Sequence, residues 1–461
     1  MAPYGRRRRI VGARLTLLVA TIVPAIVTAI VPAIVPAVVT MVVLAAPLAA
    51  QQRDSTARRS RADSLRADSV RVADSLAIVR ELEGRATPAN APARTAAPAQ
   101  GQPGPSNPRL LPDISAVGDL IGDLSPKGST QGDSTRFGIR EVEIALQAAV
   151  DPFFRGDVFL GISDGEGISI EQAYLTATAL PWGLEVRLGR LLLPVGKQNT
   201  THRHDLHSIE YPWVLQRFLG DEGLKGTGIY ASRIFSPLGF YQELIVTASD
   251  RFGEAPDGLR ATERANKRLT GLGYSARLRN YWDLSQASNL EFSLSAVTGR
   301  REQPVSGAAT VNAALARQSV VGADLTYRWR PLQRGLYRSF ILQGELLRQV
   351  NERNPALPAA TGSGAAVYDG PRRDYTGAYL FARWQASRRG YLGARVDALQ
   401  DPEYAGGTTR AASTYLEFFP SEFSKLVAGV ERVAPPSGFP SLTRVILQAT
   451  FALGPHKPHP F

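Results

Sequence analysis

The chain has 461 residues, no cysteine and a formal net charge of +12. The lack of cysteine excludes a disulfide framework and an N-terminal lipoprotein anchor. Residues 1–50 hold five arginines and no acid, and residues 51–110 hold ten arginines against six acids, so the remaining residues carry a net charge of only +3. The basic balance therefore comes from the N-terminal part, and we predict no nucleic-acid partner.

The first fifty residues have the three parts of a secretory signal peptide. Arginines at positions 6–9 and 14 precede a long apolar run, and residues 45–50 are mostly alanine. The run is longer than the usual apolar region of about 7–15 residues, so a retained transmembrane anchor is the alternative. Its prolines disfavour a stable membrane helix. We predict that residues 1–50 are a signal peptide removed on export.

Residues 51–85 repeat a charged, alanine- and serine-rich pattern. A 3-4 spacing typical of a coiled-coil seam runs through Ala62, Leu65, Ser69, Val72, Leu76 and Val79. A helix of only about three heptads is marginal by itself. Two interpretations stay open: a periplasmic helix that forms trimers or contacts the cell wall, and a solvated, partly disordered helix. Residues 86–110 are rich in proline and alanine and predict a linker, with a domain boundary near residue 110.

The segment 136–193 predicts four consecutive β-strands. Val142, Ile144 and Leu146 alternate with Glu141 and Glu143 in the first of them. Turn sequences at 151–152, 164–167 and 181–183 separate the four strands. Period-two alternation with a turn every dozen or so residues is typical of an antiparallel meander. Strands of about ten residues also have the length that crosses a bilayer at a tilt.

The same pattern continues to the C-terminal region. Further strands are predicted at 113–124, 227–236, 238–250, 272–279, 290–296, 321–330, 340–346, 374–386, 389–400, 409–419, 423–433 and 441–453, and loops at 194–226, 251–266, 299–316 and 351–371. The total of sixteen is even, as in bacterial barrels. We predict an all-β, transmembrane antiparallel β-barrel of about sixteen strands over 111–461, in an outer membrane of the Gram-negative type. A soluble β-sandwich or solenoid is the alternative.

Two groups of side chains have predicted places in such a barrel. Aromatic residues near strand ends, among them Tyr327, Trp329, Phe418 and Phe419, predict a girdle at the membrane interface. The polar faces of the strands predict a water-filled lumen. The predicted pore-lining residues are Arg155, Asp157, Glu141, Glu143, Arg187, Arg277, Arg279, Arg328, Arg330 and Arg395. The same faces also carry the acids Glu185, Glu291, Asp324, Glu345 and Asp397, so seven positive and eight negative charges nearly cancel and indicate no ion preference.

The predicted loop at 194–226 concentrates the histidines. His202, His204 and His207 lie within six residues, and Asp205 is among them. We interpret these four residues as part of a loop that folds inward and constricts the pore. Imidazole and carboxylate ligands would suit zinc or copper, but the spacing matches no standard metal site. We therefore predict no bound metal and no cofactor.

One stretch resembles a known family. The sequence from Gly189 to Asn199, GRLLLPVGKQN, is similar to a strand-and-loop motif of outer-membrane porins of the phosphate-selective porin O/P type. The segments 140–143 and 151–153 resemble related porin-like proteins. The resemblance covers roughly residues 112–461 and implies a sixteen-stranded, often trimeric channel that favours anions. Phe461 resembles the terminal aromatic by which barrels are recognised for assembly, although it follows a proline-rich tail at 454–460.

The sequence predicts a function without catalysis. The histidines lie in one loop or in the tail, with no nucleophile motif around them. We therefore expect no enzyme, but a porin for passive diffusion of small solutes or ions in contact with outer-membrane lipid. The alternative is a structural barrel whose N-terminal helix tethers the outer membrane to the cell wall or to a partner.

Overall fold

The computed structural model describes residues 112–126, 136–164, 167–250, 272–305, 312–351, 374–404 and 406–454. The predicted signal peptide, coiled-coil-like helix and linker at 1–110 lie outside the described residues, as do residues 455–461. These predictions are therefore not tested by the structure.

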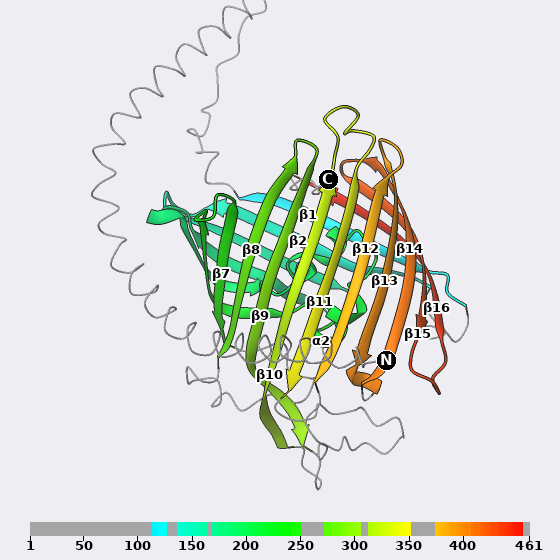
Figure 1. The fold of residues 1–461 in the computed structure, drawn as a ribbon. Coiled ribbons are helices and arrows are strands. Elements are labelled where there is room, and N and C mark those ends of the chain that lie inside the picture. Colours follow the sequence, from blue (N-terminus) through cyan, green and yellow to red (C-terminus); the bar gives the residue numbers. More distant parts are fainter. Residues whose placement is uncertain are drawn as a thin grey trace, which may run out of the picture. The chain divides into compact units, whose positions relative to one another are not determined.

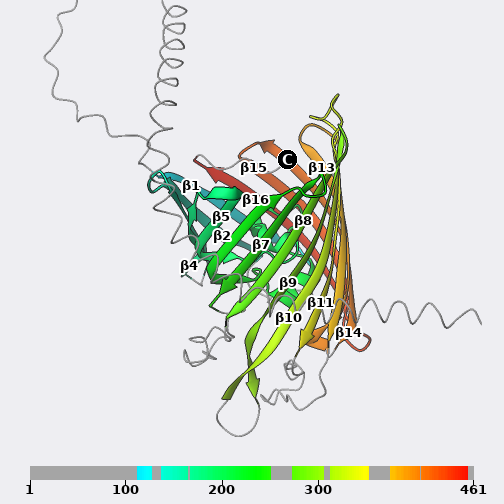
Figure 2. The same cartoon turned by 60° about the vertical axis from the view of Figure 1, so that its left-hand side comes forward.

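Sixteen antiparallel strands form a closed barrel, shown from two sides in Figures 1 and 2. Each strand pairs with its neighbours in the sequence, and β1 also pairs with β16, which closes the barrel. The strands are β1 (Asp113–Asp123), β2 (Phe137–Ala149), β3 (Phe154–Ser163), β4 (Gly167–Ala177), β5 (Leu184–Leu192), β6 (Lys225–Phe235), β7 (Tyr241–Ser249), β8 (Gly273–Ser285), β9 (Ser288–Val305), β10 (Asn312–Trp329), β11 (Phe340–Asn351), β12 (Tyr375–Gln385), β13 (Gly390–Asp401), β14 (Gly407–Ser421), β15 (Ser424–Ala434) and β16 (Leu442–Leu453). The predicted fold class and the strand number are confirmed.

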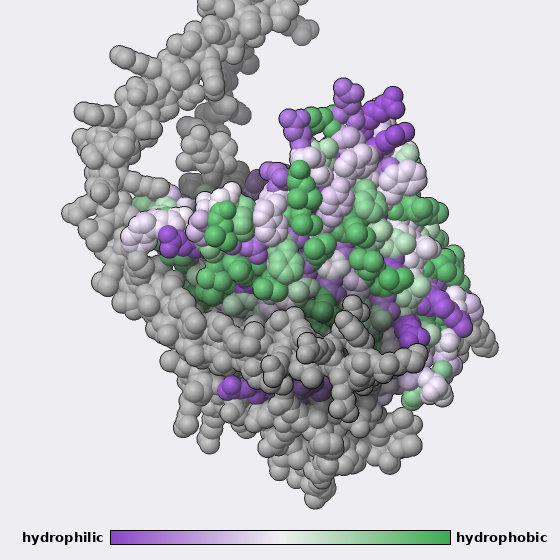
Figure 3. Space-filling model, viewed as in Figure 1, coloured by the Kyte–Doolittle hydropathy of each residue, from purple (hydrophilic) through white to green (hydrophobic). Residues whose placement is uncertain are grey.

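Alternation along the strands separates an apolar outer face from a mostly polar inner face. On β13, Leu392 and Val396 are exposed on the outside, whereas Arg395 and Asp397 are buried inside. Figure 3 shows apolar side chains gathered across the body of the barrel, with polar ones toward its upper end. This arrangement suits a barrel surrounded by lipid, because lipid tails cannot solvate polar groups.

Two details differ from the sequence prediction. The predicted loop at 299–316 is mostly strand, because the ladder between β9 and β10 continues to the pair of Val305 and Asn312. Backbone pairing in a hairpin does not require alternating side chains, so this extension of the two strands could not be predicted from alternation in the sequence. Phe419, predicted for an outer girdle, instead faces the interior and packs edge-on against Tyr391, whereas the adjacent Phe418 is exposed.

The short helices lie mostly in the connection between β5 and β6. They are the 3₁₀-helices η3 (Gln198–Thr200) and η4 (Arg203–Asp205) and the α-helix α2 (Trp213–Leu219). Two further 3₁₀-helices among the described residues, η2 (Pro181–Gly183) and η6 (Pro402–Tyr404), lie in turns between strands. Within the described part of the chain, none of the helices has the length and apolar character to cross a bilayer.

Residues 193–224, which we call the inward segment, fold into the barrel between β5 and β6. The segment appears as green coils behind the near strands in Figure 1, beside the label α2. Hydrogen bonds from the segment reach β11, β13 and β15, which lie far from β5 around the barrel. The segment therefore crosses the interior rather than covering the rim.

The outer face generates the first prediction. Leu416 and Thr408 are both exposed on the outside of β14, Leu416 near its middle and Thr408 at its end. We expect Leu416→Arg to destabilise the barrel in lipid vesicles by about 2–4 kcal/mol, because it puts a charge near the bilayer midplane. Thr408→Arg is the matched control, expected to cost about 0–1 kcal/mol near the interface. Guanidinium unfolding followed by tryptophan fluorescence measures both, and equal costs would contradict a lipid-facing β14.

Candidate functional site

The inward segment carries an apolar core into the barrel. Val195, Val214 and Phe218 are completely buried. They belong to one cluster in which lumen-facing residues of the wall take part: Val297, Val320, Leu347, Tyr375, Tyr379, Phe381, Tyr415, Val427 and Ile446. These wall residues come from β9 to β16, so the segment packs against that half of the barrel. The water-filled lumen that the polar strand faces predict does not extend to the residues of this cluster.

Cationic side chains of the wall hold the irregular backbone of the segment. Lys425 on β15 donates to the carbonyls of His204 and Leu206, at 2.6 and 3.0 Å. Arg395 on β13 donates to the carbonyl of Glu210 at 2.7 Å, and Arg140 on β2 donates to that of Ile209 at 2.8 Å. Buried carbonyls need donors, and the stretches of the segment outside its short helices have few backbone donors of their own.

Two wall residues also hold the start of the segment, one through a backbone amide and one through a backbone carbonyl. The amide of Gln198 donates to Glu345 on β11 at 2.8 Å, and Arg277 on β8 donates to the carbonyl of Gly196. Gly196 has a φ of 65°, and a Cβ at this position would lie 2.1 Å from Oε2 of Glu345. Glycine is favoured here, because other residues are strained at this φ and an added side chain would push the carboxylate of Glu345 away from Gln198.

A further glycine of the wall lets the segment approach. A Cβ at Gly429 on β15 would lie 2.6 Å from Cδ1 of Ile209 and 3.0 Å from Cδ1 of Tyr415. The lack of a side chain at Gly429 therefore makes the space in which Ile209 is buried.

Glu210 gathers three arginines around the middle of the segment. Its carboxylate lies 3.2 Å from Arg140, 2.6 Å from Arg203 and 3.8 Å from Arg444. Burial by itself would raise the pKa of Glu210, but the three positive charges outweigh burial and hold that pKa below the ordinary value. Glu210 therefore stays ionised and links the segment to β2 and β16.

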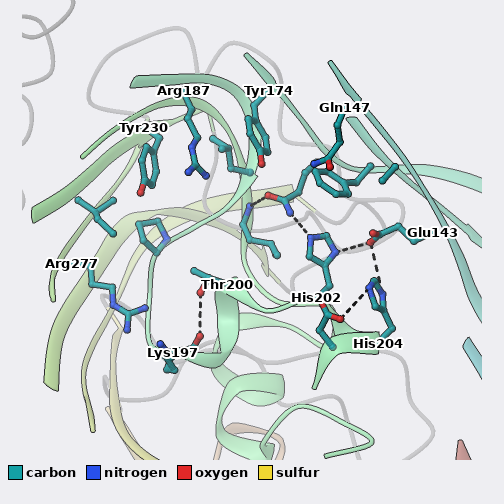
Figure 4. Close-up of a pocket in the computed structure, with 18 of the residues that line it drawn as sticks. Glu143, Gln147, Tyr174, Arg187, Lys197, Thr200, His202, His204, Tyr230 and Arg277 are labelled. Atoms are coloured by element: carbon teal, nitrogen blue, oxygen red, sulfur yellow. Dashed lines mark hydrogen bonds and ion pairs between the residues drawn. The ribbon is translucent and has the colours of Figure 1, made fainter. Parts of the chain in front are cut away.

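A polar cavity of about 590 Å³ remains between the segment and the wall formed by β1 to β8. Figure 4 shows its lining in two groups that face each other. One group contains Arg187, Lys197 and Arg277, and the other contains Glu143 with the two histidines His202 and His204.

The positive side of the cavity is braced by aromatic rings and by acids. The guanidinium of Arg187 lies over the rings of Tyr174 and Tyr230, 5.3 and 4.9 Å from their centroids. It also pairs with Glu185 at 2.7 Å. Burial lowers the pKa of Lys197, and the pairing with Glu291 at 2.9 Å only partly offsets that effect.

The structure places the predicted pore-lining residues in several different surroundings. Glu143, Arg187, Arg277 and Arg279 line the 590 Å³ cavity, and Glu141 lines a small hollow beside it. Arg155 and Asp157 form a pair at 3.0 Å. Arg328 and Arg330 line a second cavity of about 840 Å³ among the short turns at one end of the barrel. Arg395 faces the interior, but the inward segment covers it and leaves its side chain 1% exposed.

The four residues predicted for a constriction loop lie in the inward segment, but not all at the cavity. His202, His204 and Asp205 line the cavity, whereas His207 stacks on the ring of Phe381 with centroids 6.2 Å apart. Burial lowers the pKa of His207, and the charges of Arg383 and Lys425 lower it further. His207 is therefore neutral and packs as an aromatic residue.

Sequence reasoning missed the residues that anchor the segment. Alternation in the predicted strand 423–433 places Lys425 on one face with Val427 and Glu431, but this face gives no sign that its lysine binds backbone carbonyls. Glu210 and Gly429 carry no local signal, because their roles depend on contacts between residues that are distant in the sequence.

Comparisons with known proteins show which proteins this chain is similar to in sequence or in fold. No family model matches the chain. An uncharacterized protein of Aquifex aeolicus (strain VF5) is 26% identical over 347 residues, which cover 70% of each chain. The solved structures that resemble this chain include the outer membrane channel DcaP of Acinetobacter baumannii, with a TM-score of 0.48 and 10% identity over 74% of this chain and 96% of that one.

Two further solved structures are similar at a comparable level. They are OprB of Pseudomonas putida (TM-score 0.46, 10% identity, 74% of this chain and 94% of that one) and an anion-selective porin from Comamonas acidovorans (TM-score 0.46, 11% identity, 75% of this chain and 99% of that one). The resemblance to the phosphate-selective type stays a prediction.

The close approach at Gly429 generates the second prediction. We expect Gly429→Val to displace the inward segment, because the added atoms occupy the space of Ile209. Trypsin should then cleave after Arg203 in the variant and not in the wild-type protein. Gly138→Val is the matched control, because a Cβ at Gly138 meets nothing within 4 Å. Equal resistance of all three proteins to trypsin would contradict the proposed contact.

The charge of Glu210 generates a third prediction, on pH. Because the folded pKa of Glu210 lies below the ordinary 4.5, its contribution is present above pH 4.5 and is lost as pH falls through the lowered pKa. We expect Glu210→Gln to reduce hydrogen-exchange protection of α2 roughly tenfold at pH 7, where it removes charge-assisted hydrogen bonds. The difference from wild type should shrink as the pH falls through the lowered pKa of Glu210.

The control for this measurement is Glu422→Gln, in the turn between β14 and β15 and outside the inward segment. Glu422→Gln should leave the protection of α2 unchanged at every pH. A difference between Glu210→Gln and wild type that does not vary with pH would mean that Glu210 acts by packing and not by its charge.

Proposed function

We propose that the chain is an outer-membrane channel of the porin type for passive diffusion of small hydrophilic solutes. The observation that carries this proposal is the polar cavity between the inward segment and the wall of β1 to β8. A closed barrel with an apolar outside supplies the membrane-crossing wall. The inward segment narrows the space inside this wall, and small solutes pass beside the segment.

The lining supports passage of solutes with little preference for charge. Each cation of the cavity has an acid close by: Arg187 has Glu185, Lys197 has Glu291, Arg277 has Asp324 and Arg279 has Glu243. Paired charges create a strong local field but only a small net charge. We propose a weakly selective pore, and an anion preference is the alternative that the family resemblance implies. Trimer formation and contact with the cell wall stay predictions from the sequence.

A structural barrel is the second candidate, and the filled half of the interior favours it. The apolar core of the inward segment closes the space along β9 to β16. A barrel in which this packing extended across the whole lumen would conduct nothing. The two candidates therefore differ in one feature. A channel needs a water-filled path between the 590 Å³ cavity and the 840 Å³ cavity, and a structural barrel does not.

Single-channel recording of the refolded protein in a planar bilayer tests the choice. We expect discrete conductance steps and, in a salt gradient, a reversal potential close to zero. A reversal potential that shows strong anion or cation selectivity would contradict the proposal of weak selectivity, but the proposal of a channel would stand. A barrel that is folded and inserted, yet shows no steps, would contradict the channel and favour the structural barrel.

A charge reversal at Arg187 gives the fourth prediction. Arg187→Glu removes a cation from the cavity and leaves Glu185 unpaired, so we expect the reversal potential to shift toward cation selectivity. Arg432→Glu is the matched control, because Arg432 is exposed on the outer face of β15. An equal shift in both variants would mean that the cavity beside Arg187 is not on the conduction path.

A further inference from the structure

Three potential metal ligands converge where the inward segment meets β2. Glu143 belongs to β2, and His202 and His204 lie two residues apart in the segment. One ligand atom from each residue lies within 4.8 Å of the other two. Among the described residues, this is the only group of three histidine or acidic side chains whose ligand atoms come so close together. Figure 4 shows both imidazoles turned toward the carboxylate.

The distances suit a zinc ion after small movements of the side chains. Nδ1 of His202 lies 2.7 Å and Nδ1 of His204 lies 4.0 Å from Oε2 of Glu143. Around tetrahedral zinc, ligand atoms at 2.0–2.1 Å from the metal lie about 3.3 Å from one another. The two observed separations lie on either side of this value. Movements of less than about 1 Å would therefore bring the atoms to zinc-ligand spacing.

The far side of each imidazole also faces a polar side chain. Nε2 of His202 lies 2.6 Å from the amide nitrogen of Gln172 on β4, and Oε1 of Gln172 accepts from the backbone amide of Leu192. Nε2 of His204 lies 3.7 Å from Oδ1 of Asp205. A zinc-bound imidazole donates its other N–H to an outer acceptor, which fixes its orientation and raises its basicity. Zinc on Nδ1 of His202 therefore requires the amide of Gln172 to turn its oxygen toward the ring.

We infer that Glu143, His202 and His204 bind a zinc ion that links the inward segment to β2. Two nitrogens and one carboxylate oxygen are a ligand set that zinc accepts, with a fourth position left for water. The cavity supplies that position, because all three residues line it. The ion would add a coordination link between the wall and the segment on the side of the barrel opposite the apolar core.

Zinc titration of the refolded protein tests this inference without relying on conduction. The chain has five histidines, and His456 and His459 lie in the tail, so His456→Gln and His459→Gln form the background for all variants. Isothermal titration with zinc chloride at pH 7.5 should show one ion per chain. We expect His202→Gln and His204→Gln each to weaken binding by a factor of roughly 100 or more, and Gln172→Ala by roughly 10- to 100-fold.

His207→Gln is the matched control, because His207 lies in the same segment and stacks on Phe381 away from the cluster. It should bind zinc as the background protein does. Barrel folding in each variant is checked by migration of the unheated protein in detergent gels. X-ray absorption at the zinc edge should show nitrogen and oxygen neighbours at about 2.0–2.1 Å. Absence of binding in the background protein, or equal binding after both His202→Gln and His204→Gln, would overturn the inference.

Discussion

The structure depends on the donation of hydrogen bonds from wall cations to the carbonyls of the inward segment. Lys425, Arg395 and Arg140 reach the segment from three different strands. A buried carbonyl without a donor costs about 1–3 kcal/mol, and this segment has little helix in which to satisfy its own backbone. An irregular segment is stable at this depth because the surrounding strands supply the donors that water would supply outside.

The same anchoring divides the interior into two halves with different properties. Toward β9 to β16, apolar side chains of the segment and of the wall form a core like that of a soluble domain. Toward β1 to β8, charged and aromatic side chains enclose a polar cavity. The wall residues match this division, because Leu347 and Val427 face the core whereas Arg187 and Glu143 face the cavity. The position of the segment therefore sets both the width and the chemistry of the remaining space.

Because the segment forms one side of the cavity, whatever holds the segment also shapes the cavity. Glu345 and Arg277 hold its first turn, while Glu210 and its three arginines hold its middle. His202 and His204 lie between these two anchors and meet Glu143 on β2. An ion at this cluster would act on the part of the segment between the two anchors. In the proposed channel, pore width and the proposed metal binding would thereby be linked through one piece of backbone.

The sequence by itself determined the barrel, because alternation is a local property that each strand displays on its own. It also placed Arg187, Arg277 and Glu143 on the inner face, and it marked residues 194–226 as a loop of special composition. Only the tertiary structure decided what that loop contacts. The apolar core, the carbonyls held by Lys425 and the grouping of Glu143 with the histidines join residues far apart in the chain. Such contacts follow from how the barrel closes, and no local pattern encodes them.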